Sequence, residues 1–177
     1  MHNFRKITEN LYNIGANDRR ITMFENAHPV PRGMSYNSYL LLDEKTVLLD
    51  GVDNAIIEQF WQNLTAVLDG RQLDYLVINH LEPDHCHPIP ELLRRYPGLT
   101  IVANKKAFTM LDQFYEVELE GRMLEVKEGD QLQTGKHNLT FYFAPMVHWP
   151  EVMVTYDSTS KILFSADAFG TFGATDG

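Results

Sequence analysis

The sequence of 177 residues has a single cysteine, Cys86, and few basic side chains for its length. One cysteine cannot form a disulfide within the chain, which is typical of proteins in a reducing compartment. The 15 lysine and arginine residues are outnumbered by 24 aspartate and glutamate residues, so the formal net charge is −9. Binding to phosphate backbones requires a basic face. The composition therefore argues against a nucleic-acid-binding protein.

Long apolar runs and compositionally biased segments are also missing. No stretch approaches the roughly 20 apolar residues that span a bilayer, and no apolar segment of a signal peptide follows the N-terminal residues 1–6. We therefore expect a cytoplasmic protein with no membrane contact. Because no repeat, low-complexity run or linker divides the sequence, we predict one domain over residues 1–177.

The hydrophobic pattern predicts a mixture of strands and helices, followed by strands alone. In the first part we expect strands at 39–42, 46–49, 73–78 and 99–102, a helix capped by Asn54 and stopped by Gly70, and helices at 91–95 and 107–114. Beyond residue 120 we expect strands at 123–126, 131–133, 139–143, 152–156 and 162–164. This order indicates an α/β or α+β layered domain with mixed sheets.

Four ionisable side chains follow the predicted strand at 73–78. They are His80, Glu82, Asp84 and His85, all within six residues. Such a cluster is costly to pack together unless something offsets the charge. A metal cation does so, because imidazole and carboxylate groups bind it directly. The segment is therefore a candidate metal-binding loop.

Two later residues have the same character. His148 follows the predicted strand at 139–143, and Asp167 comes at the end of the strand-like run 162–166. With these two, the chain offers three imidazoles and three carboxylates, too many for one tetrahedral zinc ion. The set suits two adjacent metal ions with a bridging carboxylate. Because it lacks a thiolate, it favours iron or manganese over structural zinc.

These residues also carry a family resemblance. The pattern His-x-Glu-x-Asp-His, then a distant His and Asp, resembles the metallo-β-lactamase superfamily, whose hydrolytic members usually have His-x-His-x-Asp-His. Glu82 in place of the second His resembles the flavodiiron proteins of the rubredoxin:oxygen oxidoreductase or nitric oxide reductase type. Further similar segments lie at 35–40, 77–80, 146–150 and 164–170. The resemblance implies a metallo-β-lactamase-like αββα sandwich.

The resemblance also implies a ligand set and a reaction. His80, Glu82 and His148 would bind one iron, Asp84 and His85 the other, and Asp167 would bridge them. The diiron centre would reduce O2 to water or NO to N2O, with electrons delivered through FMN. Trp149 would lie near that flavin. In this family the FMN belongs to a flavodoxin-like domain, the electron donor is a rubredoxin or flavin reductase, and the subunits form a head-to-tail homodimer.

The end of the sequence departs from the family pattern. One further ligand His and the flavodoxin-like domain of the family lie beyond residue 177. We therefore expect a C-terminally truncated chain whose sandwich is incomplete and which does not bind FMN by itself. Whether it is an enzyme alone is left open. Cys86 and His87 also replace the small residue pair common at that point, so His87 is a candidate to approach the metals.

Other interpretations remain at this stage. A dinuclear zinc hydrolase acting on an ester, thioester or phosphodiester is the first alternative, although Glu82 argues against it. A non-enzymatic diiron sensor of O2 or NO is the second, and a truncated domain that binds metal weakly or not at all is the third. His28 and His137 occupy turn-like segments and are expected to be exposed, whereas Cys86 is expected to be a packed small side chain.

Overall fold

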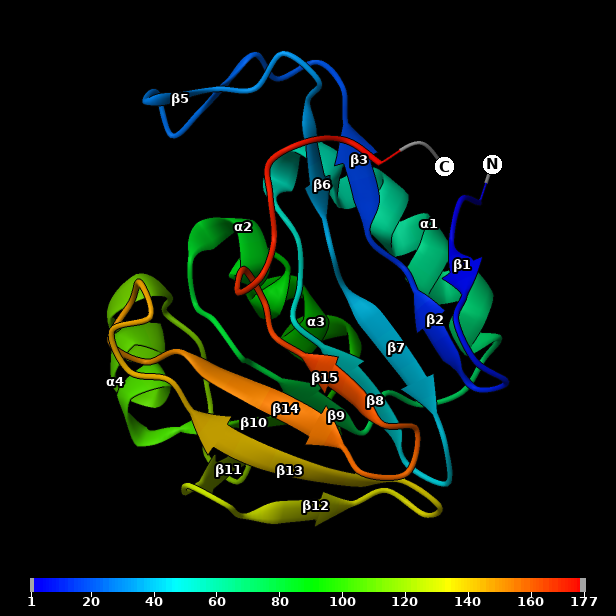
Figure 1. Ribbon diagram of the computed structural model, residues 1–177. Coiled ribbons are helices and arrows are strands. Elements are labelled where there is room, and N and C mark those ends of the chain that lie inside the picture. The colour runs from blue at the N-terminus through cyan, green and yellow to red at the C-terminus, as the bar shows by residue number, and fades with distance from the viewer. Residues whose placement is uncertain (1, 176–177) are drawn as a thin grey trace.

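A computed structural model describes residues 2–175 and shows two β-sheets packed face to face (Figure 1). The strand order is β1-β2-β7-β8-β9-β10-β11 in the larger sheet and β12-β13-β14-β15 in the smaller. The strands of the larger sheet are β1 (Arg5–Lys6), β2 (Leu11–Asn13), β7 (Tyr39–Leu42), β8 (Thr46–Leu49), β9 (Tyr75–Val77), β10 (Thr100–Asn104) and β11 (Met123–Val126). Those of the smaller are β12 (Gln131–Gln133), β13 (Asn138–Phe143), β14 (Met153–Asp157) and β15 (Ile162–Phe164).

Short hairpin strands and the helices complete the fold. β3 (Ala16–Asp18) pairs with β6 (Met34–Tyr36), and β4 (Met23–Phe24) pairs with β5 (His28–Pro29). The helices are the 3₁₀ turn η1 (Asn54–Ile56), α1 (Ile57–Leu68), α2 (Pro83–Cys86), α3 (Ile89–Arg95) and α4 (Lys105–Phe114). Within residues 2–175, none of these helices has the length and apolar character to cross a bilayer.

The core has two layers, one on each face of the larger sheet. Alternate residues of the parallel strands point to opposite sides, so Leu48 and Leu76 pack under the helices, whereas Leu49 and Val77 face the smaller sheet. Because both faces are buried, these strands appear in the sequence as continuous apolar runs. The predicted α/β class with mixed sheets is confirmed, since β8 to β11 are parallel and the flanking pairs antiparallel.

The outer face of the smaller sheet has no helical cover in the described part of the chain. Tyr142 and Leu163 are exposed there, while the buried faces of α1, α3 and α4 all join the core cluster under the larger sheet. Residues 2–175 therefore form three of the four layers of the predicted αββα sandwich.

Helix α1 forms where the sequence predicts it, but the side-chain cap belongs to the 3₁₀ turn η1 that precedes it. Phe60, Leu64 and Leu68 repeat at four-residue spacing and are all buried. The predicted N-cap, Asn54, is wrong, because the Asp53 side chain accepts the hydrogen bond from the Ala55 backbone N at 2.7 Å. Asp and Asn are almost equally good N-caps, so adjacent candidates cannot be separated by residue type alone.

The other differences concern short elements. The helix predicted at 91–95 begins at Ile89, and the one predicted at 107–114 begins at Lys105 with Asn104 as its N-cap. The four-residue α2 and the short strands β1 to β6 are not predicted from the sequence. Segments of two to four residues are too short to display a hydrophobic period.

His137 is buried, so the prediction of an exposed side chain is wrong for this histidine. Its Nδ1 donates to Asp157 Oδ2 at 2.7 Å, and its Nε2 lies 2.6 Å from Asn10 Nδ2. These partners come from the end of β14 and from the N-terminal segment, 20 and 127 positions away in sequence. His28, in contrast, is exposed as predicted.

The two sheets bring several strand ends to one edge of the molecule. β8 and β9 run parallel with Leu49 opposite Val77, so the segments after both strands leave at the same edge. Met153 at the start of β14 donates its N–H to Asn79 O, which places the loop at 144–152 beside the end of β9. The end of β15 reaches the same edge through its pairing with β14.

Candidate metal centre

The predicted metal-binding loop leaves β9 and turns at once into α2. His80 lies in the loop, Glu82 immediately precedes α2, and Asp84 and His85 lie within that helix. Pro83 at the first helical position favours the turn, because its fixed φ suits a helix start and its missing N–H is not needed there. A single short segment thus aims four side chains at the edge where the strands end.

A buried hydrogen-bond network holds the start of this loop. Asp50, which follows β8, accepts hydrogen bonds from Asn79 N at 2.7 Å and from Asn79 Nδ2 at 2.8 Å. Thr155 of β14 donates to Asn79 Oδ1 at 2.6 Å, so the network joins both sheets. Gly51 N donates to His85 O at 2.6 Å, and a Cβ on Gly51 would lie 2.7 Å from that oxygen. Glycine is therefore required at this close approach.

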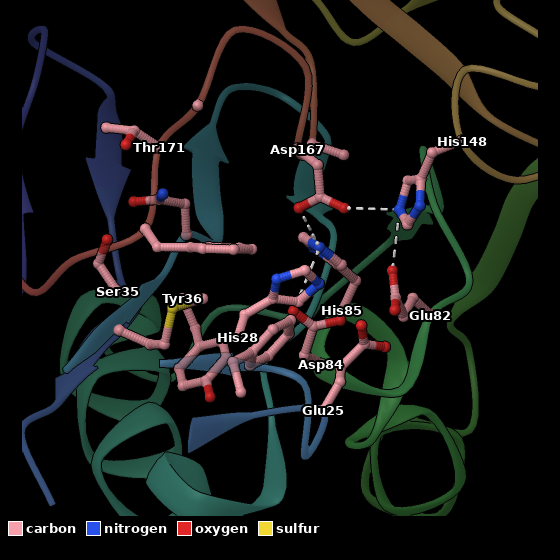
Figure 2. Close-up of a pocket in the computed structure, with 16 residues that line it drawn as sticks. Glu25, His28, Ser35, Tyr36, Glu82, Asp84, His85, His148, Asp167 and Thr171 are labelled. Atoms are coloured by element: carbon pink, nitrogen blue, oxygen red, sulfur yellow. Dashed lines mark hydrogen bonds and ion pairs between the residues drawn. The ribbon is translucent and has the colours of Figure 1, made fainter. Parts of the chain in front are cut away.

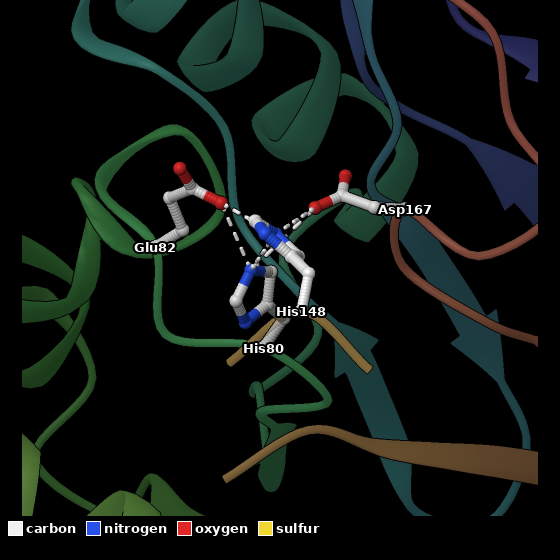
Figure 3. Close-up of side chains that lie close together, drawn as sticks. All are labelled: His80, Glu82, His148 and Asp167. Atoms are coloured by element: carbon white, nitrogen blue, oxygen red, sulfur yellow. Dashed lines mark hydrogen bonds and ion pairs between the residues drawn. The ribbon is translucent and has the colours of Figure 1, made fainter. Parts of the chain in front are cut away.

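Four side chains converge on one point (Figure 3). His80 Nε2 lies 3.0 Å from Glu82 Oε2 and 3.1 Å from His148 Nε2. His148 Nε2 is 3.0 Å from the same oxygen of Glu82. Asp167 Oδ2 lies 3.3 Å from His148 Nε2 and 3.5 Å from His80 Nε2. The four come from the loop after β9, the β13–β14 loop and the segment after β15.

A second group shares Asp167 with the first. Asp84, His85 and Asp167 bring their ligand atoms within 4.8 Å of one another. His85 Nε2 lies 2.7 Å from Asp167 Oδ1 and 3.7 Å from Asp84 Oδ2. The two oxygens of Asp167 therefore face different groups, Oδ2 the first and Oδ1 the second. This is the arrangement of a carboxylate that bridges two cations.

The residues present fit a pair of metal ions. Ligand bonds of about 2.1 Å place neighbouring ligand atoms about 3.0 to 3.4 Å apart, close to the distances in the first group. The buried Asp84 Oδ1 has no hydrogen-bond partner in the structure, and an unpaired buried carboxylate oxygen is costly. Oxygen and imidazole donors without a thiolate suit iron, manganese or zinc.

The close packing of these histidine and carboxylate side chains shifts their pKa values in the metal-free protein. Burial alone would lower the pKa of His80, but hydrogen bonds to Glu151 and Glu82 raise it to about 10. Burial raises the pKa of Asp84 to about 6. Burial opposes ionisation of Asp167 as well, yet a hydrogen bond from a facing histidine lowers its pKa to about 2. Protons and cations therefore compete for this site.

We expect metal binding to weaken as the pH falls. His80 must lose the proton on Nε2 to bind a cation, and its pKa of about 10 lies above the working range. The apparent Zn²⁺ affinity should therefore fall about tenfold for each pH unit below 8. Competition with a chromophoric chelator at pH 6.0, 7.0 and 8.0 measures this, with circular dichroism to verify folding. An affinity that stays constant over this range would contradict a protonated His80 in the free chain.

A cavity of about 550 Å³ opens beside both groups (Figure 2). Its wall includes the aromatic side chains of Phe24, Tyr36 and Phe172, and its rim includes the exposed His28. Glu25, on the turn between β4 and β5, shares a hydrogen bond with Glu82, which raises the pKa of Glu25. Because Glu82, His148, Asp84, His85 and Asp167 also line the cavity, a small molecule inside it can reach both donor groups.

The structure brings together all six residues that the sequence singles out: His80, Glu82, Asp84, His85, His148 and Asp167. Trp149 is half-buried against the core, with its ring centroid 5.3 Å from that of His80. His87 is exposed and belongs to neither group. Cys86 is buried as expected, with Sγ 3.1 Å from Leu81 O. Burial raises the pKa of its thiol to about 12, which makes it a poor nucleophile.

Two residues that shape the site are missed by the sequence analysis. Asp50 supports the loop from the neighbouring strand, and Glu151 hydrogen-bonds His80. Both are single acidic residues without a motif of their own. Glu151 could have been suspected because it lies three residues after His148, at the point where the chain enters β14.

The chain is similar to a β-lactamase-like family and to proteins named as nitric oxide reductases and flavodiiron proteins. The family model described as ODP family beta lactamase matches residues 34–176. A nitric oxide reductase from Moorella thermoacetica is 38% identical over 170 residues, covering 96% of this chain and 42% of that protein. The flavodiiron protein from Giardia intestinalis superposes with a TM-score of 0.93 at 30% identity, covering 100% of this chain and 43% of that one.

A second solved structure agrees. Rubredoxin oxygen:oxidoreductase from Desulfovibrio gigas gives a TM-score of 0.90 at 34% identity, with 98% of this chain and 43% of that chain covered. The chain thus spans less than half the length of these relatives. The predicted resemblance to flavodiiron proteins and the metallo-β-lactamase-like fold are both confirmed.

Proposed function

This chain belongs to the ODP family of β-lactamase-like domains, and from that membership we propose that it is the diiron oxidoreductase part of a flavodiiron protein. Its substrates are O2, which becomes water, or NO, which becomes N2O. The observation that carries the proposal is the placement of Asp167, with one carboxylate oxygen toward His80 and His148 and the other toward His85.

The chain's own residues supply the ligands for two irons. The first position has His80, Glu82, His148 and Asp167, and the second has Asp84, His85 and Asp167. Iron bound by these residues would supply electrons to a diatomic substrate. The three carboxylates favour the oxidised state of iron by their negative charge, which supports iron over zinc.

The side chains that line the cavity have two proposed roles, to accommodate the substrate and to deliver protons to it. Reduction of O2 to two waters takes four electrons and four protons, and reduction of two NO to N2O and water takes two of each. Glu25 shares a hydrogen bond with Glu82 at the cavity wall, which raises the pKa of Glu25, so this carboxyl group is the proposed proton carrier beside the first position. The aromatic wall formed by Phe24 and Phe172 provides an apolar surface that suits an uncharged diatomic.

The electrons would be supplied by FMN on a flavodoxin-like domain, in cis or in trans, with a rubredoxin or flavin reductase as the donor. The name of the Desulfovibrio gigas relative supports the rubredoxin. Trp149, which packs edge-on against His80 at 5.3 Å and lies 6.3 Å from the His148 ring, is the proposed neighbour of the flavin. A head-to-tail homodimer that brings the flavin of one subunit to the irons of the other is part of this proposal. A cytoplasmic location remains a prediction.

Turnover with a supplied electron donor tests this function. We expect the iron-loaded chain, given chemically reduced FMN under anaerobic conditions, to consume added O2 or to convert NO to N2O over many cycles. An O2 electrode and gas chromatography of N2O measure the two reactions, and the zinc-loaded chain is the control. Ligand binding without repeated turnover would favour a sensor. Cleavage of a phosphodiester or thioester by the zinc form, without gas reduction by the iron form, would favour a hydrolase.

A further inference from the structure

Glu151 lies behind His80, on the side away from the cavity. Its Oε1 is 2.8 Å from His80 Nδ1 and accepts a second hydrogen bond from Leu81 N at 2.9 Å. The Glu151 side chain is fully buried, and that of His80 is only 1% exposed. The carboxylate is therefore fixed against both the ring and the backbone of the metal-binding loop.

This contact decides which ring nitrogen of His80 carries the proton. A carboxylate can only accept hydrogen bonds, and His80 faces one at each ring nitrogen, Glu151 at Nδ1 and Glu82 at Nε2. When a cation takes the place of the proton between Nε2 and Glu82, the one remaining ring proton stays on Nδ1, toward Glu151. The Nε2 lone pair then points at the group formed with Glu82 and His148. A histidine that binds a metal commonly donates its other N–H to a carboxylate, which orients the ring and strengthens it as a ligand.

The backbone of Glu151 is held as well. Asn104 Nδ2 donates to Glu151 O at 2.6 Å, while Asn104 Oδ1 caps α4 by accepting from Ala107 N. The same loop carries His148, so one segment contacts His80 from both sides, at Nε2 through His148 and at Nδ1 through Glu151. The position of this carboxylate is therefore set by the fold and not by His80 alone.

The other histidine of the metal-binding loop has no such partner. His85 Nδ1 is buried without a hydrogen bond in the described structure, and so is Glu151 Oε2. Glu151 thus contacts the metal-binding loop through Oε1 alone, at the His80 ring and the Leu81 backbone. A buried carboxylate oxygen without a partner is costly, and a cation on the far side of His80 offsets that cost.

We propose that Glu151 is a positioning residue for the metal centre, holding His80 as the Nδ1–H tautomer and strengthening its Nε2 as a ligand. The inference rests on the proposed function, because it assumes that His80 binds a metal. It adds a residue outside the six ligands that governs metal affinity through one of them.

Two variants of Glu151 separate geometry from charge. E151Q keeps an oxygen that can accept from His80 Nδ1 but removes the negative charge, and E151A removes both. The matched control is D43N, because Asp43 is also a buried carboxylate that accepts two hydrogen bonds, from Thr134 Oγ1 and His137 N. It lies at the opposite end of the strands and does not contact the metal-binding residues.

The experiment measures Zn²⁺ affinity by chelator competition and the His80 tautomer by ¹⁵N NMR of the zinc-loaded chain. We expect E151A to bind Zn²⁺ about 10- to 100-fold more weakly than the parent and to lose the Nδ1–H signal of His80. E151Q should keep that signal while binding with intermediate affinity. D43N should bind within about twofold of the parent even if its unfolding midpoint falls, since it does not alter any neighbour of the ligands.

The outcomes distinguish this inference from the proposed function. If the parent binds Zn²⁺ but E151A and E151Q bind it equally well with unchanged His80 signals, the role of Glu151 is overturned and the metal centre stands. If the folded parent binds no Zn²⁺, the metal centre itself is overturned, and the role of Glu151 with it. A loss of affinity in D43N as large as in E151A would reduce the effect to general destabilisation and would also overturn the inference.

Discussion

Replacement of Asp167 by alanine should leave the chain unable to hold two metal ions. Among residues 2–175, Asp167 is the only one shared by the two donor groups, and its Oδ1 makes the 2.7 Å contact with His85. Without it, the second position retains only Asp84 and His85. An outer partner of a ligand is worth about 10- to 100-fold in metal affinity, so loss of a direct ligand should weaken the second position by more than about 100-fold.

Metal analysis of the reconstituted D167A variant measures this effect. We expect about one iron per chain in place of two, and gas reduction indistinguishable from the metal-free background. D112A is the matched control, because Asp112 is an exposed aspartate on α4 and its removal should change neither quantity. Two tightly bound irons per D167A chain would contradict the bridging role.

Replacement of Asp50 by alanine should produce the largest loss of stability. The variant leaves the buried Asn79 N and Asn79 Nδ2 without their acceptor, and each unsatisfied buried donor costs about 1 to 3 kcal/mol. We expect the free energy of unfolding to fall by about 3 to 5 kcal/mol, measured by urea denaturation of the metal-free chain. Because Asn79 directly precedes His80, the metal-binding loop should also lose its fixed position.

The control for D50A is D69A. Both residues have a left-handed backbone, with φ of 55° for Asp50 and 46° for Asp69, so both alanines incur the same backbone cost of about 1 to 2 kcal/mol. Asp69 is exposed at the end of α1 and supports no buried network. If D50A is destabilised no more than D69A, the Asp50–Asn79 hydrogen bonds do not hold the loop.

Much of the fold and the composition of the site could be predicted from the sequence, because their signals are local. Four of the six candidate ligands lie within residues 80–85, and His148 and Asp167 each follow an apolar strand. The central strands were predicted correctly because burial on both faces makes them continuously apolar. That these residues bind iron remains a prediction.

The parts that could not be predicted depend on contacts between distant residues. Glu151 and His80 are 71 positions apart, and Asp50 and Asn79 are 29 apart. Apart from its place three residues after His148, nothing in the residues around Glu151 distinguishes it from a surface carboxylate before the sheets pack. The exposure predicted for His137 is wrong for the same reason, since its partner Asn10 lies 127 residues away.

The presence of two irons at one bridged site is tested most directly by anaerobic reconstitution with Fe²⁺, followed by iron analysis and Mössbauer spectroscopy of the folded chain. The geometry of Asp167 between the two donor groups predicts two irons per chain and, after oxidation, the spectrum of a magnetically coupled pair. One iron or none in the folded chain, or two irons without magnetic coupling, would contradict a shared carboxylate bridge.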